Sequence, residues 1–175
     1  MEMVLRYMKV LMLSTDNKIL EKGAEARARM EEYAELFEQL FIIIASQRKT
    51  SVTPRLNSGQ GLPRQEARND NPIKIGGNLF IYATNSNNKI SALWGAYRIG
   101  KKILSNNKVM DPSFRWDDSA VRDWAITAQD PFELGLVGYL LKKKFSVPLQ
   151  LQVHTDFLSP YFWHESLKNK IRVLM

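Results

Sequence analysis

A histidine with two polar neighbours is the group in this sequence best suited to chemistry on a ligand. His154, Thr155 and Asp156 directly follow Pro148–Val153, a short segment that predicts a β-strand. Open α/β sheets bind ligands beyond the carboxyl ends of their strands, and an imidazole there can donate a hydrogen bond to a hydroxyl or carbonyl group. A purely structural role stays open, because His154 can cap the strand and Thr155 and Asp156 can form an Asx-type turn.

A strong helix start precedes this strand. Asp130 suits the N-cap, Pro131 suits the first helical position, and Glu133 can reach back to the cap. The helix closes on Lys142–Lys144, whose charges favour the negative end of the helix dipole. Since Trp124–Ala128 predicts a buried strand before the helix, the unit is βαβ with a right-handed crossover. Asp130 is a candidate substrate-binding residue, although N-capping alone explains it.

Strands and helices alternate along the rest of the chain. Met8–Ser14 predicts the first buried strand, which makes residues 1–7 an extension, and a helix is expected over about Ala24–Gln39. Phe41–Ala45 and Asn78–Thr84 predict two further strands. We therefore expect one α/β domain with a doubly wound, mostly parallel Rossmann-like sheet. A further helix is expected after the third strand, with an apolar face of Ile90, Leu93, Trp94, Tyr97 and Leu104; Trp94, Tyr97 and Trp124 are interpreted as core residues.

The charge of the chain is unevenly distributed. The net charge is +7, and the basic excess follows the first helix, including residues 47–76, which are rich in Arg, Pro and Gly and predict a long loop. An anionic partner such as a phospholipid headgroup, a nucleotide phosphate or a nucleic acid is one interpretation, and a solvated basic face is the other. Arg27, on the first helix, could hold a phosphate of a donor or lipid-linked acceptor, or could pair with Glu31.

Composition excludes several classes of protein. The chain has no cysteine, which excludes disulfides and thiolate metal sites, and only His154 and His164 are available as histidine ligands. We expect no metal and no cofactor. No apolar segment reaches the length of a membrane span, so we expect a cytoplasmic protein, with peripheral contact at the inner membrane face left open.

Two other functions were weighed. A dinucleotide-dependent oxidoreductase needs a glycine-rich turn after a strand, and Gly59-Gln60-Gly61 lacks the third glycine and lies in the basic loop. A non-enzymatic basic module for anionic lipid or nucleic acid stays open as the alternative function. No aromatic residue interleaves the basic residues of the loop, however, so a nucleic acid is not the partner we expect.

Two longer motifs carry a resemblance to a known family. Thr127-Ala128-Gln129-Asp130-Pro131-Phe132-Glu133-Leu134-Gly135 and Gln152-Val153-His154-Thr155-Asp156-Phe157-Leu158-Ser159-Pro160 resemble the amino-terminal domain of retaining glycosyltransferases of family 4. The similarity covers roughly residues 8–175.

The resemblance implies a GT-B architecture, in which two Rossmann-like domains face each other across a cleft. The first domain holds the acceptor, a glycan, lipid or small molecule, and the second binds the nucleotide-sugar donor. His154 matches the family's histidine beside the donor sugar and is the candidate catalytic residue. Ser14, Arg27, Asp130, Thr155 and Asp156 are candidate substrate-binding residues.

The sequence also departs from the family's pattern. Many members carry a glycine pair after the first strand, whereas Ser14 to Gly23 contains only Gly23. The family's second domain carries two glutamates eight positions apart, and no two glutamates of this chain have that separation. We therefore expect the carboxyl-terminal donor-binding domain to be absent and the 175-residue chain alone to be inactive.

Overall fold

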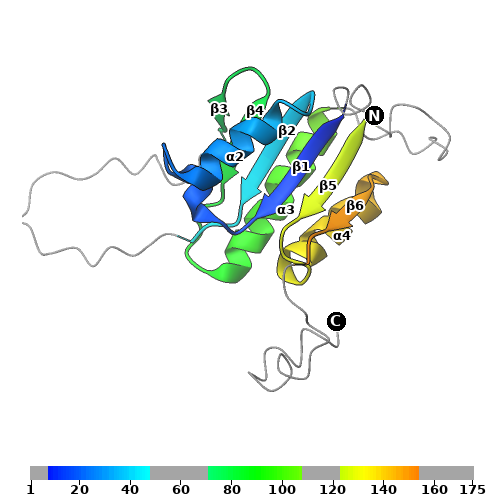
Figure 1. Ribbon diagram of the computed structural model, residues 1–175. Coiled ribbons are helices and arrows are strands. Elements are labelled where there is room, and N and C mark those ends of the chain that lie inside the picture. The colour runs from blue at the N-terminus through cyan, green and yellow to red at the C-terminus, as the bar shows by residue number, and fades with distance from the viewer. Residues whose placement is uncertain (1–7, 48–70, 108–122, 154–175) are drawn as a thin grey trace, which may run out of the picture.

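A six-stranded sheet forms the centre of the protein (Figure 1). The computed structural model describes residues 8–47, 71–107 and 123–153. The strand order is β3-β4-β2-β1-β5-β6, and every neighbouring pair is parallel except β3 and β4. This arrangement confirms the predicted doubly wound, mostly parallel α/β fold. The strands are β1 (Lys9–Ser14), β2 (Gln39–Ile44), β3 (Ile73–Ile75), β4 (Leu79–Ala83), β5 (Trp124–Ala128) and β6 (Leu149–Leu151).

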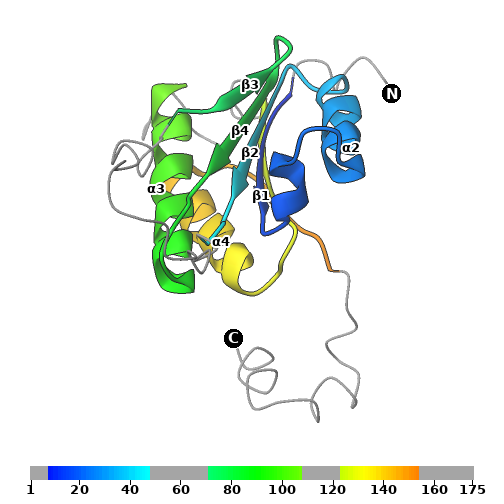
Figure 2. The ribbon, with the colours of Figure 1, turned by 90° about the vertical axis from the view of Figure 1, so that its left-hand side faces the viewer.

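Helices cover both faces of the sheet (Figure 2). The short 3-10 helix η1 (Asn17–Leu20) and α2 (Glu25–Ala34) lie on one face, and α3 (Lys89–Asn106) and α4 (Glu133–Phe145) lie on the other. Since side chains alternate along a strand, the sheet separates two apolar cores. Among the helices of the described ranges, none is both long and apolar enough to cross a membrane.

The first helix is shorter than predicted. It ends at Ala34 rather than Gln39, and Gln39 is already the first residue of β2. The side-chain amide of Asn78 donates to the carbonyl oxygens of Ala34 at 2.5 Å and of Phe37 at 3.3 Å. These bonds add to the one from the Phe37 N–H to the Ala34 carbonyl, so a distant residue helps to satisfy the carbonyl groups at the helix end.

The predicted loop over residues 47–76 contains a strand at its end. Ile73–Ile75 forms β3 and pairs antiparallel with β4 through a tight turn. Gly76 occupies that turn with φ of 59°, a conformation that glycine adopts without steric cost. Residues 48–70 lie outside the described residues, as does the segment after Pro160.

The buried face of α3 agrees only in part with the predicted one: Leu104 is buried and Leu93 and Tyr97 pack against the core, whereas Ile90 is 81% exposed. Trp94 is 62% exposed, so its interpretation as a core residue is wrong, whereas Trp124 is 4% exposed and is confirmed as core. Small residues also lie on the buried face and let the helix approach its neighbours closely. A Cβ added at Gly100 would lie 2.7 Å from Leu141 Cδ1 of α4. The buried residues of α3 are Ala92, Ala96, Ile99, Gly100, Ile103 and Leu104.

Candidate functional site

The strand order creates a switch point between β1 and β5. From β1 the chain continues through β2 to β4 on one side, and β5 and β6 extend the sheet on the other. The connections after β1 and after β5 therefore leave the sheet in opposite directions. In doubly wound folds this is the place where the loops separate and ligands bind. The residues at the carboxyl ends of β1 and β5 therefore form the candidate site.

Ser14 and Gln129 meet at this switch point. Ser14, the last residue of β1, is fully buried, and its Oγ donates to Oε1 of Gln129 at 2.5 Å. The same Oγ accepts a hydrogen bond from the backbone N–H of Asp16 at 3.0 Å. Gln129 follows β5 directly, and its backbone N–H donates to the carbonyl of Leu13 at 3.0 Å. A hydroxyl and an amide are thus held together by both strands.

Gln152 continues this polar edge at the end of β6. Its backbone N–H donates to the carbonyl of Ala128 at 2.9 Å, and its side-chain amide donates to Oγ1 of Thr127 at 3.3 Å. Thr127 is buried within β5. The described chain reaches Val153 just beyond β6 at this edge, and the candidate residues His154, Thr155 and Asp156 lie outside the described residues.

Two aspartates close the turns on either side of the switch point. Asp130 Oδ1 accepts from the backbone N–H groups of Phe132 at 2.8 Å and Glu133 at 2.9 Å. Asp130 thus bonds the N–H groups expected of an N-cap aspartate, but the predicted N-cap position is wrong: the helix begins at Glu133, and its N-cap is Phe132. On the β1 side, Asp16 Oδ1 accepts from the N–H of Lys18 at 2.9 Å. Carboxylates thus bind backbone N–H groups that in a phosphate site would face the ligand.

A second polar cluster lies at the ends of β2 and β4. Ser46 is buried, and its Oγ accepts from the backbone N–H of Asn85 at 3.0 Å and donates to Asn85 Oδ1 at 3.3 Å. Thr84 Oγ1 donates to the carbonyl of Ser46 at 2.9 Å. Asn85 has a φ of 45°, a left-handed conformation that asparagine tolerates better than most residues. These bonds tie the loop after β2 to the loop after β4.

Arg27 contacts its own side of the fold. Its Nε lies 3.3 Å from Glu31 Oε1, and its guanidinium donates to the carbonyl of Leu20 at 3.5 Å. The ion pair is the structural alternative weighed for this residue, and the second bond ties α2 to the end of η1. Arg27 therefore links two helices on the α2 face of the sheet.

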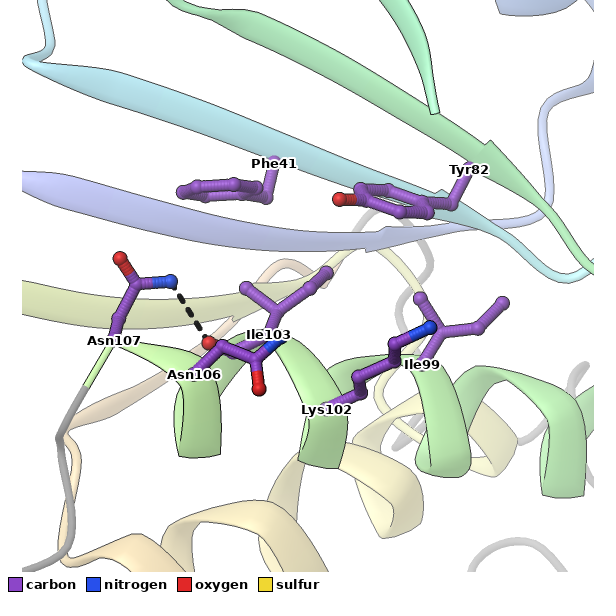
Figure 3. Close-up of a pocket in the computed structure, with 7 residues that line it drawn as sticks. All are labelled: Phe41, Tyr82, Ile99, Lys102, Ile103, Asn106 and Asn107. Atoms are coloured by element: carbon purple, nitrogen blue, oxygen red, sulfur yellow. Dashed lines mark hydrogen bonds between the residues drawn. The ribbon is translucent and has the colours of Figure 1, made fainter. Parts of the chain in front are cut away.

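A small hollow lies under the carboxyl-terminal half of α3 (Figure 3). Its volume of about 100 Å³ is well below that of most ligand pockets. Burial raises the pKa of Tyr82 in its wall. We assign no ligand to this hollow. It is lined by Phe41, Tyr82, Ile99, Lys102, Ile103, Asn106 and Asn107.

The sequence missed the partner that makes Ser14 a site residue. Gln129 belongs to the motif Thr127–Gly135, in which the sequence indicated only the adjacent Asp130 as a candidate substrate-binding residue. A signal was present, because Gln129 directly follows a predicted strand, as Ser14 ends one. Over residues 8–47, 71–107 and 123–153 no group of three or more His, Asp or Glu residues could hold a metal ion. The described fold and site define a Rossmann-like domain with a neutral and acidic polar edge.

Comparison with known proteins adds no functional information. No protein-family model matches the chain, and no curated protein matches it. One solved structure that matches is the C-terminal domain of a hydrogenase from Pyrococcus furiosus, at 10% sequence identity. The match covers 85% of this chain and 92% of that domain, with a TM-score of 0.38, and supports no conclusion about function.

Proposed function

We propose that this chain is the acceptor-side Rossmann-like domain of a metal-independent retaining glycosyltransferase. The parent enzyme would move a sugar from a nucleotide-sugar donor to a hydroxyl of a glycan, lipid or small molecule. The observation that carries the proposal is the contact between Ser14 and Gln129 at the switch point, flanked by Asp16 and Asp130.

The chemistry of this edge favours a hydroxyl-rich ligand. Amide and carboxylate groups can each bond a sugar hydroxyl, which both donates and accepts hydrogen bonds, and the buried Ser14 hydroxyl holds the Gln129 amide in place. A phosphate is disfavoured, because Asp16 and Asp130 occupy backbone N–H groups of the adjacent turns and add negative charge. A dinucleotide site would need a glycine-rich turn after β1, where this chain has Ser14-Thr15-Asp16.

The two motifs that resemble family 4 glycosyltransferases start at adjacent strands. The first runs from Thr127, in β5, and contains Gln129 and Asp130. The second starts at Gln152, beside β6, which pairs with β5. In the proposed enzyme His154 would donate a hydrogen bond to the sugar being transferred. Such fixed polar groups stabilise the oxocarbenium-like transition state of glycosyl transfer.

The test is a ligand titration of the ¹⁵N-labelled 175-residue chain followed by nuclear magnetic resonance. The panel contains neutral methyl hexosides and disaccharides, UDP and NAD⁺. We expect saturable shifts of the Ser14, Asp16 and Gln129 amide signals with a glycoside. Replacing Gln129 by leucine removes the amide and should weaken that binding about tenfold, the effect of losing about 1.4 kcal/mol.

Gln150→Leu is the matched control, because Gln150 is an exposed glutamine one strand away, in β6. Its affinity for the same glycoside should stay within about twofold, less than 0.5 kcal/mol. The proposal is wrong if NAD⁺ or UDP shifts these signals while no glycoside does, or if the glycoside-induced shifts lie only on other elements.

A further inference from the structure

The outer faces of α3 and α4 expose large apolar side chains. Ile90 is 81% exposed, and Trp94 stacks on Tyr97 with ring centroids 5.5 Å apart while most of its surface meets solvent. Single exposed apolar residues are common, but contiguous patches mark interaction surfaces. The exposed apolar side chains of the two helices are Ile90, Trp94, Leu136, Tyr139 and Leu140.

The two helices lie side by side and pack on each other, so their outer faces adjoin (Figure 2). An ion pair between Lys89 and Glu133 joins their first turns. Further along, a Cβ at Gly100 would touch Leu141. The exposed apolar residues lie in the amino-terminal and middle turns of the two helices, and the cationic residues other than Lys89 lie in the middle and carboxyl-terminal turns.

Helices α3 and α4 carry many cationic residues and a single carboxylate. Helices α3 and α4 together hold seven Lys or Arg residues and one Glu, a net charge of 7 − 1 = +6. Lys101 of α3 lies close enough to Lys144 of α4 to lower the pKa of Lys144 by Coulomb repulsion. The opposite layer is acidic, because residues 25–38 hold five Glu and two Arg, a net charge of 2 − 5 = −3. The seven cations are Lys89, Arg98, Lys101, Lys102, Lys142, Lys143 and Lys144.

We propose that the outer face of α3 and α4 binds the surface of an anionic lipid bilayer. Ile90, Trp94, Leu136 and Leu140 would enter the boundary between headgroups and acyl chains, where Trp is also favoured. The lysines would remain at the headgroups, attracted by their negative charge. This inference does not depend on the proposed glycosyltransferase function.

Charge and side-chain type favour a bilayer over a nucleic acid. A strand of nucleic acid needs a positive groove with aromatic rings on which bases can stack. Here three of the five exposed apolar residues are aliphatic, and one of the two aromatic ones, Trp94, is already stacked on Tyr97. A bilayer instead uses apolar and cationic residues side by side, each at its own depth.

The experiment measures binding of the full chain to vesicles of phosphatidylglycerol and, separately, of phosphatidylcholine. We expect binding to phosphatidylglycerol vesicles alone, weakened by salt. The double variant Lys101→Gln/Lys144→Gln should lose about thirty-fold in affinity, from about fivefold for each lysine near a charged membrane. Trp94→Ser should also bind more weakly, although this variant keeps every charge.

Matched controls come from the opposite layer. Lys18→Gln/Lys22→Gln removes two exposed lysines, and Leu36→Ser removes an exposed apolar side chain, so both should bind like the unmodified chain. Circular dichroism checks that each variant is folded.

Several results would overturn the proposal. These are absence of binding to phosphatidylglycerol vesicles, equal binding to phosphatidylcholine, or equal losses in the control and test variants. Displacement of vesicle-bound protein by a single-stranded oligonucleotide, with the same dependence on Lys101 and Lys144, would assign the face to nucleic acid instead.

Discussion

The hydrogen bond between Ser14 and Gln129 should be measurable as a coupling energy in a double-mutant cycle. Ser14→Ala removes a fully buried hydroxyl that bonds both Gln129 Oε1 and the Asp16 N–H. A hydrogen bond contributes about 1 kcal/mol net, and leaving a buried partner unpaired costs about 1–3 kcal/mol. Because Gln129 is only partly buried, water can replace part of the loss. We expect Ser14→Ala to lower the free energy of unfolding by about 2 kcal/mol.

The assay is urea unfolding of the unmodified chain, Ser14→Ala, Gln129→Ala and the double variant. If the two side chains bond as described, the double variant loses less than the sum of the single losses, with a coupling of about 1 kcal/mol. The matched control pairs Ser14→Ala with Asn78→Ala. Asn78 precedes β4 at the opposite edge of the sheet, so these two changes should be additive within about 0.5 kcal/mol. Additivity of Ser14→Ala and Gln129→Ala would refute the contact and, with it, the site.

Two further predictions concern stability. Asp130→Ala removes an acceptor for two backbone N–H groups and should lower the free energy of unfolding in urea by about 1 kcal/mol. Asp130→Asn keeps an acceptor oxygen and should lose less than half of that. Equal losses in the two variants would contradict the capping role. Burial raises the pKa of Tyr82, so the unfolded chain releases the phenol proton at a lower pH than the folded chain does. The effect of Tyr82 on the free energy of unfolding should therefore be constant below pH 10.0, and the free energy should fall as the pH rises further. Tyr82→Phe should flatten this decline in urea unfolding above that pH, and an unchanged slope would refute the assignment.

The sequence predicted the parallel strands well, because each buried strand is a short apolar run. It did not predict β3, since Ile73-Lys74-Ile75 is short and stands beside Pro, Gly and Asn residues. Its pairing with β4 depends on the turn at Gly76. Likewise, the carbonyl groups at the end of α2 are satisfied in part by Asn78, which is 44 positions from Ala34. Both features result from contacts that no local pattern contains.

The buried face of α3 shows a different limit. This helix has a strip of large apolar residues that includes Ile90 and Trp94, and a strip of small ones that includes Ala96 and Gly100. Hydrophobicity favours the first strip as the core. The structure buries the second strip together with the large residues Ile99, Ile103 and Leu104, and at Gly100 the approach to Leu141 of α4 leaves no room for a Cβ.

The candidate site could be predicted only in part. Local patterns point to Ser14 and Asp130 separately, because Ser14 ends a predicted strand and Asp130 starts a predicted helix. It could not bring Ser14 and Gln129 together, because they are 115 positions apart and meet only when β5 lies next to β1. Strand order is a property of the whole sheet, which local residue patterns do not determine.

The two faces of the sheet are covered unequally, and this determines where the fold opens first. The α2 layer buries only Ala26, Met30 and Ala34 from its ten-residue helix, whereas α3 and α4 bury long apolar faces and also pack on each other. Regions with few buried apolar contacts open at lower free energy than the rest of a protein. Since η1 and α2 follow directly after Ser14, local unfolding of this layer releases the turn that holds Asp16 while β5 and α4 keep Gln129 in place. We therefore expect the β5 and α4 side of the switch point to stay folded while the η1 and α2 side opens and closes.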